Sequence, residues 1–163
     1  MELRTEFSKT DIGLKVLYSG LLVGTFDILA ALVNYYLSTG KNPLFVFKYI
    51  ASGLFGTDAF SGGIAIILAG LLLHYIIAMV FAVVFYLLYF NAPILSAYKI
   101  VTGIMYGVFV WTIMNLIVVP LSQTPKSAFN GLQALKEMLI LIVMIGLPLS
   151  FLAHYFFSIK NRK

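Results

Sequence analysis

The chain has very few charged side chains, and one long stretch has none at all. Between Asp58 and Lys99, 40 consecutive residues include no aspartate, glutamate, lysine or arginine. Charged residues make up 10% of the chain, hydrophobic residues make up 61%, and the mean hydropathy is +1.00. These values lie outside the range of soluble domains. The composition therefore excludes a soluble fold and indicates an integral membrane protein.

Cysteine and the common catalytic motifs are also missing. Without cysteine there is no disulfide framework and no thiolate metal site. The sequence has no HExxH or GxSxG motif, no paired carboxylates, no P-loop and no dinucleotide-binding glycine pattern. We therefore expect a protein that is not an enzyme and that holds neither a metal nor another cofactor.

Four apolar segments are long enough to cross a bilayer, which takes about 20 residues at a rise of about 1.5 Å each. We predict spans at about 13–38, 63–90, 98–121 and 138–159. The loops are too short for a core of their own, so residues 1–163 are expected to form one all-α membrane domain, a four-helix bundle. The first span is too long for a cleavable signal and contains Asp27, so we expect it to remain in the mature chain.

Basic residues near the ends of the spans predict the orientation in the membrane. Seven lie on the side of the termini and four on the other side, which favours cytoplasmic N- and C-termini. The inner set is Arg4, Lys9, Lys15, Lys99, Lys160, Arg162 and Lys163, and the outer set is Lys41, Lys48, Lys126 and Lys136. The net charge of +5 then reflects topology and attraction to anionic lipid, and no nucleic-acid partner is expected.

The two outer connections are predicted to hold helices of their own. The first, Asn42 to Phe60, is rich in aromatic residues that favour the headgroup layer, so we predict an interfacial or re-entrant helix between the first two spans. In the second, Ser127 is a candidate N-cap and apolar residues follow at helical spacing, which predicts a short surface helix before the fourth span. Pro148 lies inside the fourth span and is expected to kink it.

Glycines with GxxxG spacing occur in the first span, as Gly20 and Gly24, and in the third span, as Gly103 and Gly107. This spacing favours close helix packing, either between spans one and three or across a dimer seam. The same glycines are part of a faint two-helix repeat, in which His74 of the second span corresponds to His154 of the fourth.

Polar side chains at membrane depth mark the candidate site, because inserting one is costly, about 2.5 to 3.5 kcal/mol for an aspartate or lysine at mid-helix. Counting about 1.5 Å per residue from the cytoplasmic ends places Asp27 about 20 Å deep, His74 about 24 Å and Asn115 about 26 Å. Asn34 shares the polar face of Asp27, and Trp111 precedes Asn115 by one turn. We expect Asp27 and His74 to form a charge-assisted hydrogen bond inside this cluster.

Two other interpretations of these residues remain open. In the first, Asp27 and His74 instead tie two helices together, as buried polar residues often do in membrane bundles. His74 and His154 raise the alternative of a bis-histidine haem b protein, but their estimated depths differ by about 15 Å, whereas two ligands of one iron need similar depth.

Five segments carry a resemblance to a family of small bacterial four-span integral membrane proteins. They are TFDILAAL, YYLSTGKNP, KYIASGLFGTDAFSGG, AGLLLHYIIA and VVPLSQTP. The resemblance covers most of the chain and implies a location in the bacterial inner membrane with a four-span layout. It implies no activity, so no functional residue is carried over from it.

We therefore expect an oligomeric, most simply dimeric, membrane protein whose polar interior handles a small solute, an ion or protons. The alternative is an accessory or scaffold subunit of a larger membrane complex. In that case the polar residues hold helices together, and the aromatic segment from Phe45 to Phe60 is a docking surface.

Overall fold

Four long apolar helices dominate the computed structural model, which describes residues 9–126 and 130–158. They are Thr10–Thr39, Ile64–Asn91, Lys99–Leu121 and Gly131–Phe157, with mean hydropathy values of 2.0 to 2.6. Only 17% to 28% of the residues in their most apolar windows are buried inside the chain. So much exposed apolar surface fits contact with lipid rather than with water. The prediction of an all-helical fold with four helices long and apolar enough to cross a membrane is confirmed for the described residues.

The helices follow one another as two hairpins with short helices between the spans. The first two spans are α1 (Lys9–Thr39) and α3 (Ile64–Asn91), and between them lie α2 (Phe45–Phe55) and the 3-10 helix η1 (Gly56–Phe60). After α4 (Ile94–Ala97), the third span comprises α5 (Lys99–Ile113), the wide π-helical turn η2 (Met114–Val118) and α6 (Val119–Leu121). The fourth comprises α7 (Gly131–Leu141), the π turn η3 (Ile142–Gly146), α8 (Leu147–Ala153) and the π turn η4 (His154–Ser158).

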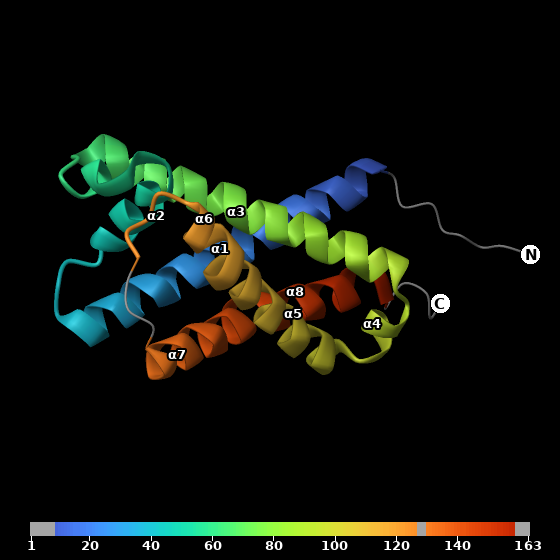
Figure 1. The fold of residues 1–163 in the computed structure, drawn as a ribbon. Helices are drawn as coiled ribbons and strands as arrows, with labels where there is room; N and C mark the ends of the chain where they lie inside the picture. Colours follow the sequence, from blue (N-terminus) through green and yellow to red (C-terminus); the bar gives the residue numbers. More distant parts are fainter. Residues whose placement is uncertain (1–8, 127–129, 159–163) are drawn as a thin grey trace, which may run out of the picture.

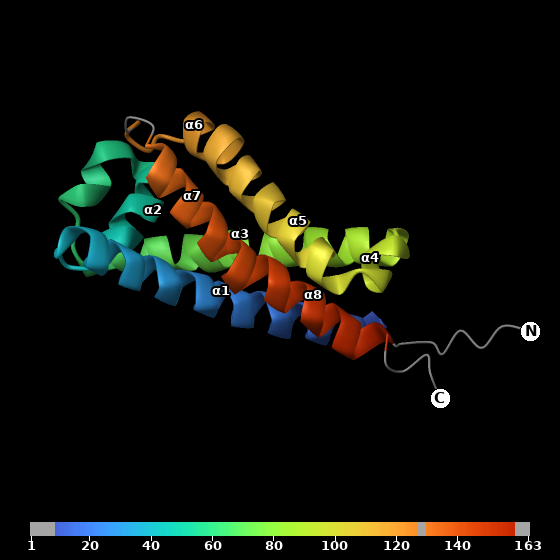
Figure 2. The same cartoon turned by 90° about the horizontal axis from the view of Figure 1, so that it is seen from below.

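The two ends of the bundle differ. The first turns of α1 and the last turns of the fourth span lie at the same end of the bundle, which we call proximal, and α2 lies at the opposite, distal end together with the start of α7 (Figure 1). In the view from below, the fourth span approaches α1 at α8 (Figure 2), and Figure 1 shows α5 crossing the fourth span, which it contacts at η3 and α8. The helix α3 contacts both α1 and α2, and α5 contacts η3 and α8.

Each glycine pair packs against the span that follows it. A side chain at Gly20 would lie 2.8 Å from Met79 of α3, and one at Gly24 would lie 3.0 Å from Ala78. At Gly103 and Gly107 a side chain would collide with the backbone of the fourth span. The glycines therefore allow close approach within each hairpin. The expected contact between spans one and three is therefore not made by these glycines. A dimer seam at these positions is also excluded, because each glycine face is already covered by the next span of the same chain.

The histidines of the faint repeat do not occupy equivalent positions. His74 contacts the carbonyl of Gly24, whereas Gly107, the counterpart of Gly24, packs against Ile142. Ile142 precedes His154 by 12 residues. Both hairpins thus pack at glycines. However, the repeat predicts His154 opposite Gly107, and the structure places Ile142 there instead.

Both prolines inside the spans follow a π-helical turn. The N–H of Val119, just before Pro120, bonds to Met114, and the N–H of Leu147, just before Pro148, bonds to Ile142. Proline lacks an N–H and its ring crowds the preceding turn, so a locally wider turn relieves that clash. The distortion that we expected at Pro148 is therefore a widened helical turn just before the proline.

The proximal half of the bundle is filled by a packed, largely aromatic core. Its fully buried members include Phe85, Tyr86 and Leu149. The Tyr106 hydroxyl donates to the Phe81 carbonyl at 2.5 Å, and the hydroxyls of Ser19 and Tyr86 share a hydrogen bond at 2.7 Å. The tyrosine hydroxyls buried here therefore have partners, as close packing away from water requires.

The helix α2 is fixed at the distal end by contacts on two sides. Its buried face contains Phe47, Ala51 and Ser52, and it approaches α3 so closely that a side chain at Gly70 would overlap the Phe47 carbonyl. On the other side, the Gln123 side chain donates to the Leu54 carbonyl at 2.9 Å. The chain turns after α1 and after α2 at Gly40 and Gly56, whose φ angles of 67° and 59° favour glycine.

The fourth helical run begins earlier than the predicted fourth span. The side chain of Asn130 accepts a hydrogen bond from the Gln133 N–H at 3.1 Å, and helix continues from Gly131 to Phe157. The expected N-cap Ser127 lies outside the described residues. Lys136 and Glu137 placed this segment in the predicted short surface helix, so the predicted span began only at residue 138.

We predict that Gly107→Ala destabilises the protein by about 1 to 3 kcal/mol, because the new methyl group would meet the backbone of Ile142. The measurement is thermal unfolding in detergent, followed by circular dichroism. Gly13→Ala is the matched control, since nothing lies within 4 Å of a side chain there. It should leave stability unchanged or raise it by up to about 1 kcal/mol. Equal melting temperatures for Gly107→Ala and wild type would contradict the assigned packing.

Candidate functional site

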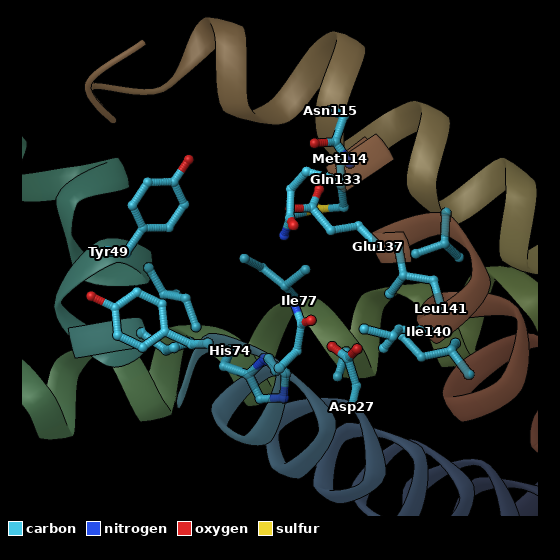
Figure 3. Close-up of a pocket in the computed structure, with 18 of the residues that line it drawn as sticks. Asp27, Tyr49, His74, Ile77, Met114, Asn115, Gln133, Glu137, Ile140 and Leu141 are labelled. Carbon is cyan, nitrogen blue, oxygen red and sulfur yellow. The ribbon is translucent and has the colours of Figure 1, made fainter. Parts of the chain in front are cut away.

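A cavity of about 550 Å³ occupies the distal half of the bundle (Figure 3). Its walls come from α1, α2, α3, the end of the third span and the beginning of the fourth. A volume of this order suits a small molecule. Four of the five residues of the predicted polar site line it, namely Asp27, Asn34, His74 and Asn115.

The cavity is closed at one end and reaches the surface at the other. Phe81, Val110 and Ile145 line it where it meets the proximal core, and they are only 8%, 1% and 3% exposed. At the distal end it is lined by Thr39, which is exposed, and by Gln133. The cavity is therefore a pocket with a packed floor rather than a pore through the bundle.

Asp27 is the acidic residue of α1 in this cavity. Its carboxylate points into the open space (Figure 3). No hydrogen bond to either carboxylate oxygen is found among residues 9–126 and 130–158. Since a charged group in the apolar part of a membrane is costly, a carboxylate without a protein donor needs another source of stabilisation.

His74 makes a different hydrogen bond from the one expected. Its Nε2 lies 2.8 Å from the Gly24 carbonyl, and since a carbonyl can only accept, Nε2 carries the hydrogen. The predicted Asp27–His74 hydrogen bond is wrong for the part of the chain that the structure describes, although the two groups lie side by side and interact electrostatically (Figure 3). The physical reason is that α3 packs closely at Gly24, so that the carbonyl of Gly24 is within reach of the imidazole.

The His74 bond belongs to a series that joins α1 to α3. Thr25 and Tyr75 share a hydrogen bond at 2.9 Å, and Ser19 and Tyr86 share one at 2.7 Å. Polar contacts of this kind commonly hold helices together in membranes. His74 therefore both ties two helices together and lines the cavity.

The remaining predicted site residues contribute unequally. Asn115 donates from Nδ2 to the Trp111 carbonyl at 3.1 Å, which leaves its side-chain oxygen available on the cavity side (Figure 3). Trp111 does not line the cavity, although its neighbours Val110 and Met114 do. The indole N–H of Trp111 is buried and has no partner within the described residues.

Six polar residues of the cavity wall were not among the predicted site residues: Tyr35, Ser38, Thr39, Tyr49, Gln133 and Glu137. Gln133 donates to the Glu137 carboxylate at 3.1 Å. These two were missed because they precede the predicted fourth span. Their spacing of four residues could have indicated that the two side chains lie on one helix face and interact.

The charged groups of the cavity wall are predominantly acidic. Asp27 and Glu137 line it, and of the described residues no lysine or arginine does. Burial raises the pKa of the Tyr49 hydroxyl, and the negative charge of Glu137 raises it further. Within the same described ranges, no group of three or more histidine, cysteine or acidic residues is placed to hold a metal ion.

No family model, curated protein or solved structure matches this chain. The chemistry of the cavity is therefore inferred from its own residues.

We predict that Glu137→Gln lowers the pKa of Tyr49, because removing the carboxylate charge makes the tyrosinate less unfavourable. Burial keeps that pKa above the usual value for tyrosine in both proteins. The measurement is an ultraviolet titration of tyrosinate, with the same titration of Tyr49→Phe subtracted in each background. Asp58→Asn, an exposed acid outside the cavity, is the control and should leave the Tyr49 titration unchanged. An unchanged titration in Glu137→Gln would show that the carboxylate does not act on Tyr49.

Proposed function

We propose that this protein translocates a small solute, an ion or protons across the bacterial inner membrane, with the distal cavity as its binding site. The observation that carries the proposal is the Asp27 carboxylate, which points into a cavity of about 550 Å³ without a hydrogen-bond donor from the described residues. A residue that served only to hold helices together would be expected to have a partner. Asn34, His74 and Asn115 add polar groups to the same space.

Passage would require the packed proximal core to open. The glycine contacts hold α1 to α3 and α5 to the fourth span, so each hairpin is suited to move as a unit. In our proposal, relative movement of the two hairpins separates Phe81 of the first from Ile145 of the second. Alternating access by movement of helix units around a central site is common in transporters.

The proposed orientation follows from the basic residues near the span ends. With both termini in the cytoplasm, the cavity opens on the outer side of the membrane. The helix α2 and the first turns of α7 then lie near the outer surface, with α2 as the interfacial or re-entrant helix and the start of α7 as the surface helix. A homo-oligomer stays part of the proposal, with a seam formed by faces other than the glycine pairs.

An accessory or scaffold role is the second candidate, and one specific observation favours it. His74, Thr25 and Ser19 all make hydrogen bonds between α1 and α3, which is what residues that only hold helices together would do. In this alternative the docking surface includes Leu54 and Phe55 of α2, which are 59% and 47% exposed.

Flux into proteoliposomes tests the first candidate against the second. We expect Asp27→Asn to lower flux about tenfold or more, the equivalent of about 1.4 kcal/mol, because it removes the charge in the cavity. His74→Ala should also lower flux. The measurement uses a pH-sensitive dye inside the vesicles and a panel of ions and small charged or neutral solutes outside.

The matched control for this experiment is Asp11→Asn, the same substitution at an exposed position of the same helix. It should keep wild-type flux. Wild-type flux in a folded Asp27→Asn variant would contradict a translocation site at Asp27. No movement of any tested solute by folded wild-type protein would favour the accessory role.

A further inference from the structure

We infer that the ligand of the distal cavity is a small organic cation, in which an ammonium group carries apolar or aromatic substituents. The inference concerns binding, and it rests on the proposed function only for the further claim that such a cation is transported. Three features of the cavity carry it: the sign of its charge, the nature of its walls and the placement of its two acids.

The charge of the cavity favours a cation. Asp27 and Glu137 contribute carboxylates, and the part of the chain that the structure describes places no lysine or arginine in the wall. The basic residues Lys41 and Lys48 do not line the distal cavity but line an adjoining cavity of about 460 Å³, which shares Tyr35 and Phe45 with it. The Lys48 ammonium donates to the Phe60 carbonyl at 3.0 Å, so its charge is directed elsewhere. An anion in the distal cavity would meet like charge without compensation, at a high cost in a low dielectric.

The walls favour an organic rather than an inorganic cation. Tyr35 and Phe45 both line the cavity and stack with ring centroids 5.8 Å apart, and Tyr49 and Phe81 add further rings. Aromatic faces attract an ammonium group when water is excluded. Inorganic cations such as Mg²⁺ and Ca²⁺ instead need several oxygen ligands at close range. Within the described ranges the acids and His74 do not form such a cluster.

The two acids lie on different hairpins, which gives the ligand a structural role. Asp27 belongs to α1 and Glu137 to α7, and both line one cavity. Glu137 already accepts from Gln133, whereas neither oxygen of Asp27 has a donor among the described residues. A bound cation would therefore compensate Asp27 most directly and would attract both hairpins to one charge.

Binding is measured through the fluorescence of Trp111, the single tryptophan of the chain. It is suited to this because its neighbours Val110 and Met114 line the cavity. The full chain in detergent is titrated with benzyltrimethylammonium, and in parallel with benzyl alcohol and with phenylacetate, which carry the same ring with no charge or a negative charge. We expect a saturable change with the cation only.

Substitutions assign that binding to the two acids. We expect Asp27→Asn to weaken cation binding about tenfold or more, and Glu137→Gln to weaken it by a smaller factor. Asp11→Asn is the control and should bind as wild type does. Circular dichroism checks the fold of each variant, and if Asp27→Asn does not fold, Glu137→Gln tests the inference alone. Equal binding of phenylacetate or benzyl alcohol, full displacement by NaCl or MgCl2 at matched ionic strength, or unchanged affinity in the folded acid variants would overturn the inference.

Binding and flux, measured together, distinguish the cation site from the proposed translocation. Saturable cation binding without cation flux in proteoliposomes would support the cation site and count against translocation. Flux of a neutral or anionic solute that depends on Asp27, without cation binding, would support translocation and overturn the cation site.

Discussion

Close helix approach at glycines is the constraint on which this structure depends. At Gly103 and Gly107 an added side chain would overlap the backbone of the fourth span, and at Gly20 and Gly24 it would press against side chains of α3. In lipid there is no hydrophobic force to bring helices together, so close packing and hydrogen bonds must hold them. The approach at Gly24 also brings its carbonyl to within 2.8 Å of His74.

The difference between the two ends of the bundle follows from what fills the space between the hairpins. In the proximal half, large rings such as Phe85 and Tyr86 occupy it and leave no room for a ligand. In the distal half, α2 packs on α3 at Gly70, and the cavity beside it is lined by polar groups, by two acids and by aromatic rings. The short helix between the first two spans therefore contributes part of the wall of the site.

The sequence predicted the spans well because the rule that governs them is compositional: a helix of sufficient length must be apolar to lie in lipid. It also predicted that Asp27, Asn34, His74 and Asn115 share a region, since depth follows from residue number along a helix. It did not predict which neighbour each residue contacts, because that depends on helix rotation and tilt. The partner of His74, the partners of the glycines and the position of Glu137 all depend on those two variables.

Asp27 and His74 looked alike in the sequence, yet their surroundings assign them different roles. His74 has its hydrogen bond to Gly24 and resembles the other residues that join α1 to α3. Asp27 has no such partner in the described ranges, so the insertion cost of a carboxylate, about 2.5 to 3.5 kcal/mol for an aspartate at mid-helix, is not offset by a protein donor. A cost of that size lowers the stability of the protein, and no contact within the described residues compensates for it. A ligand bound in the cavity in front of Asp27 would supply that compensation.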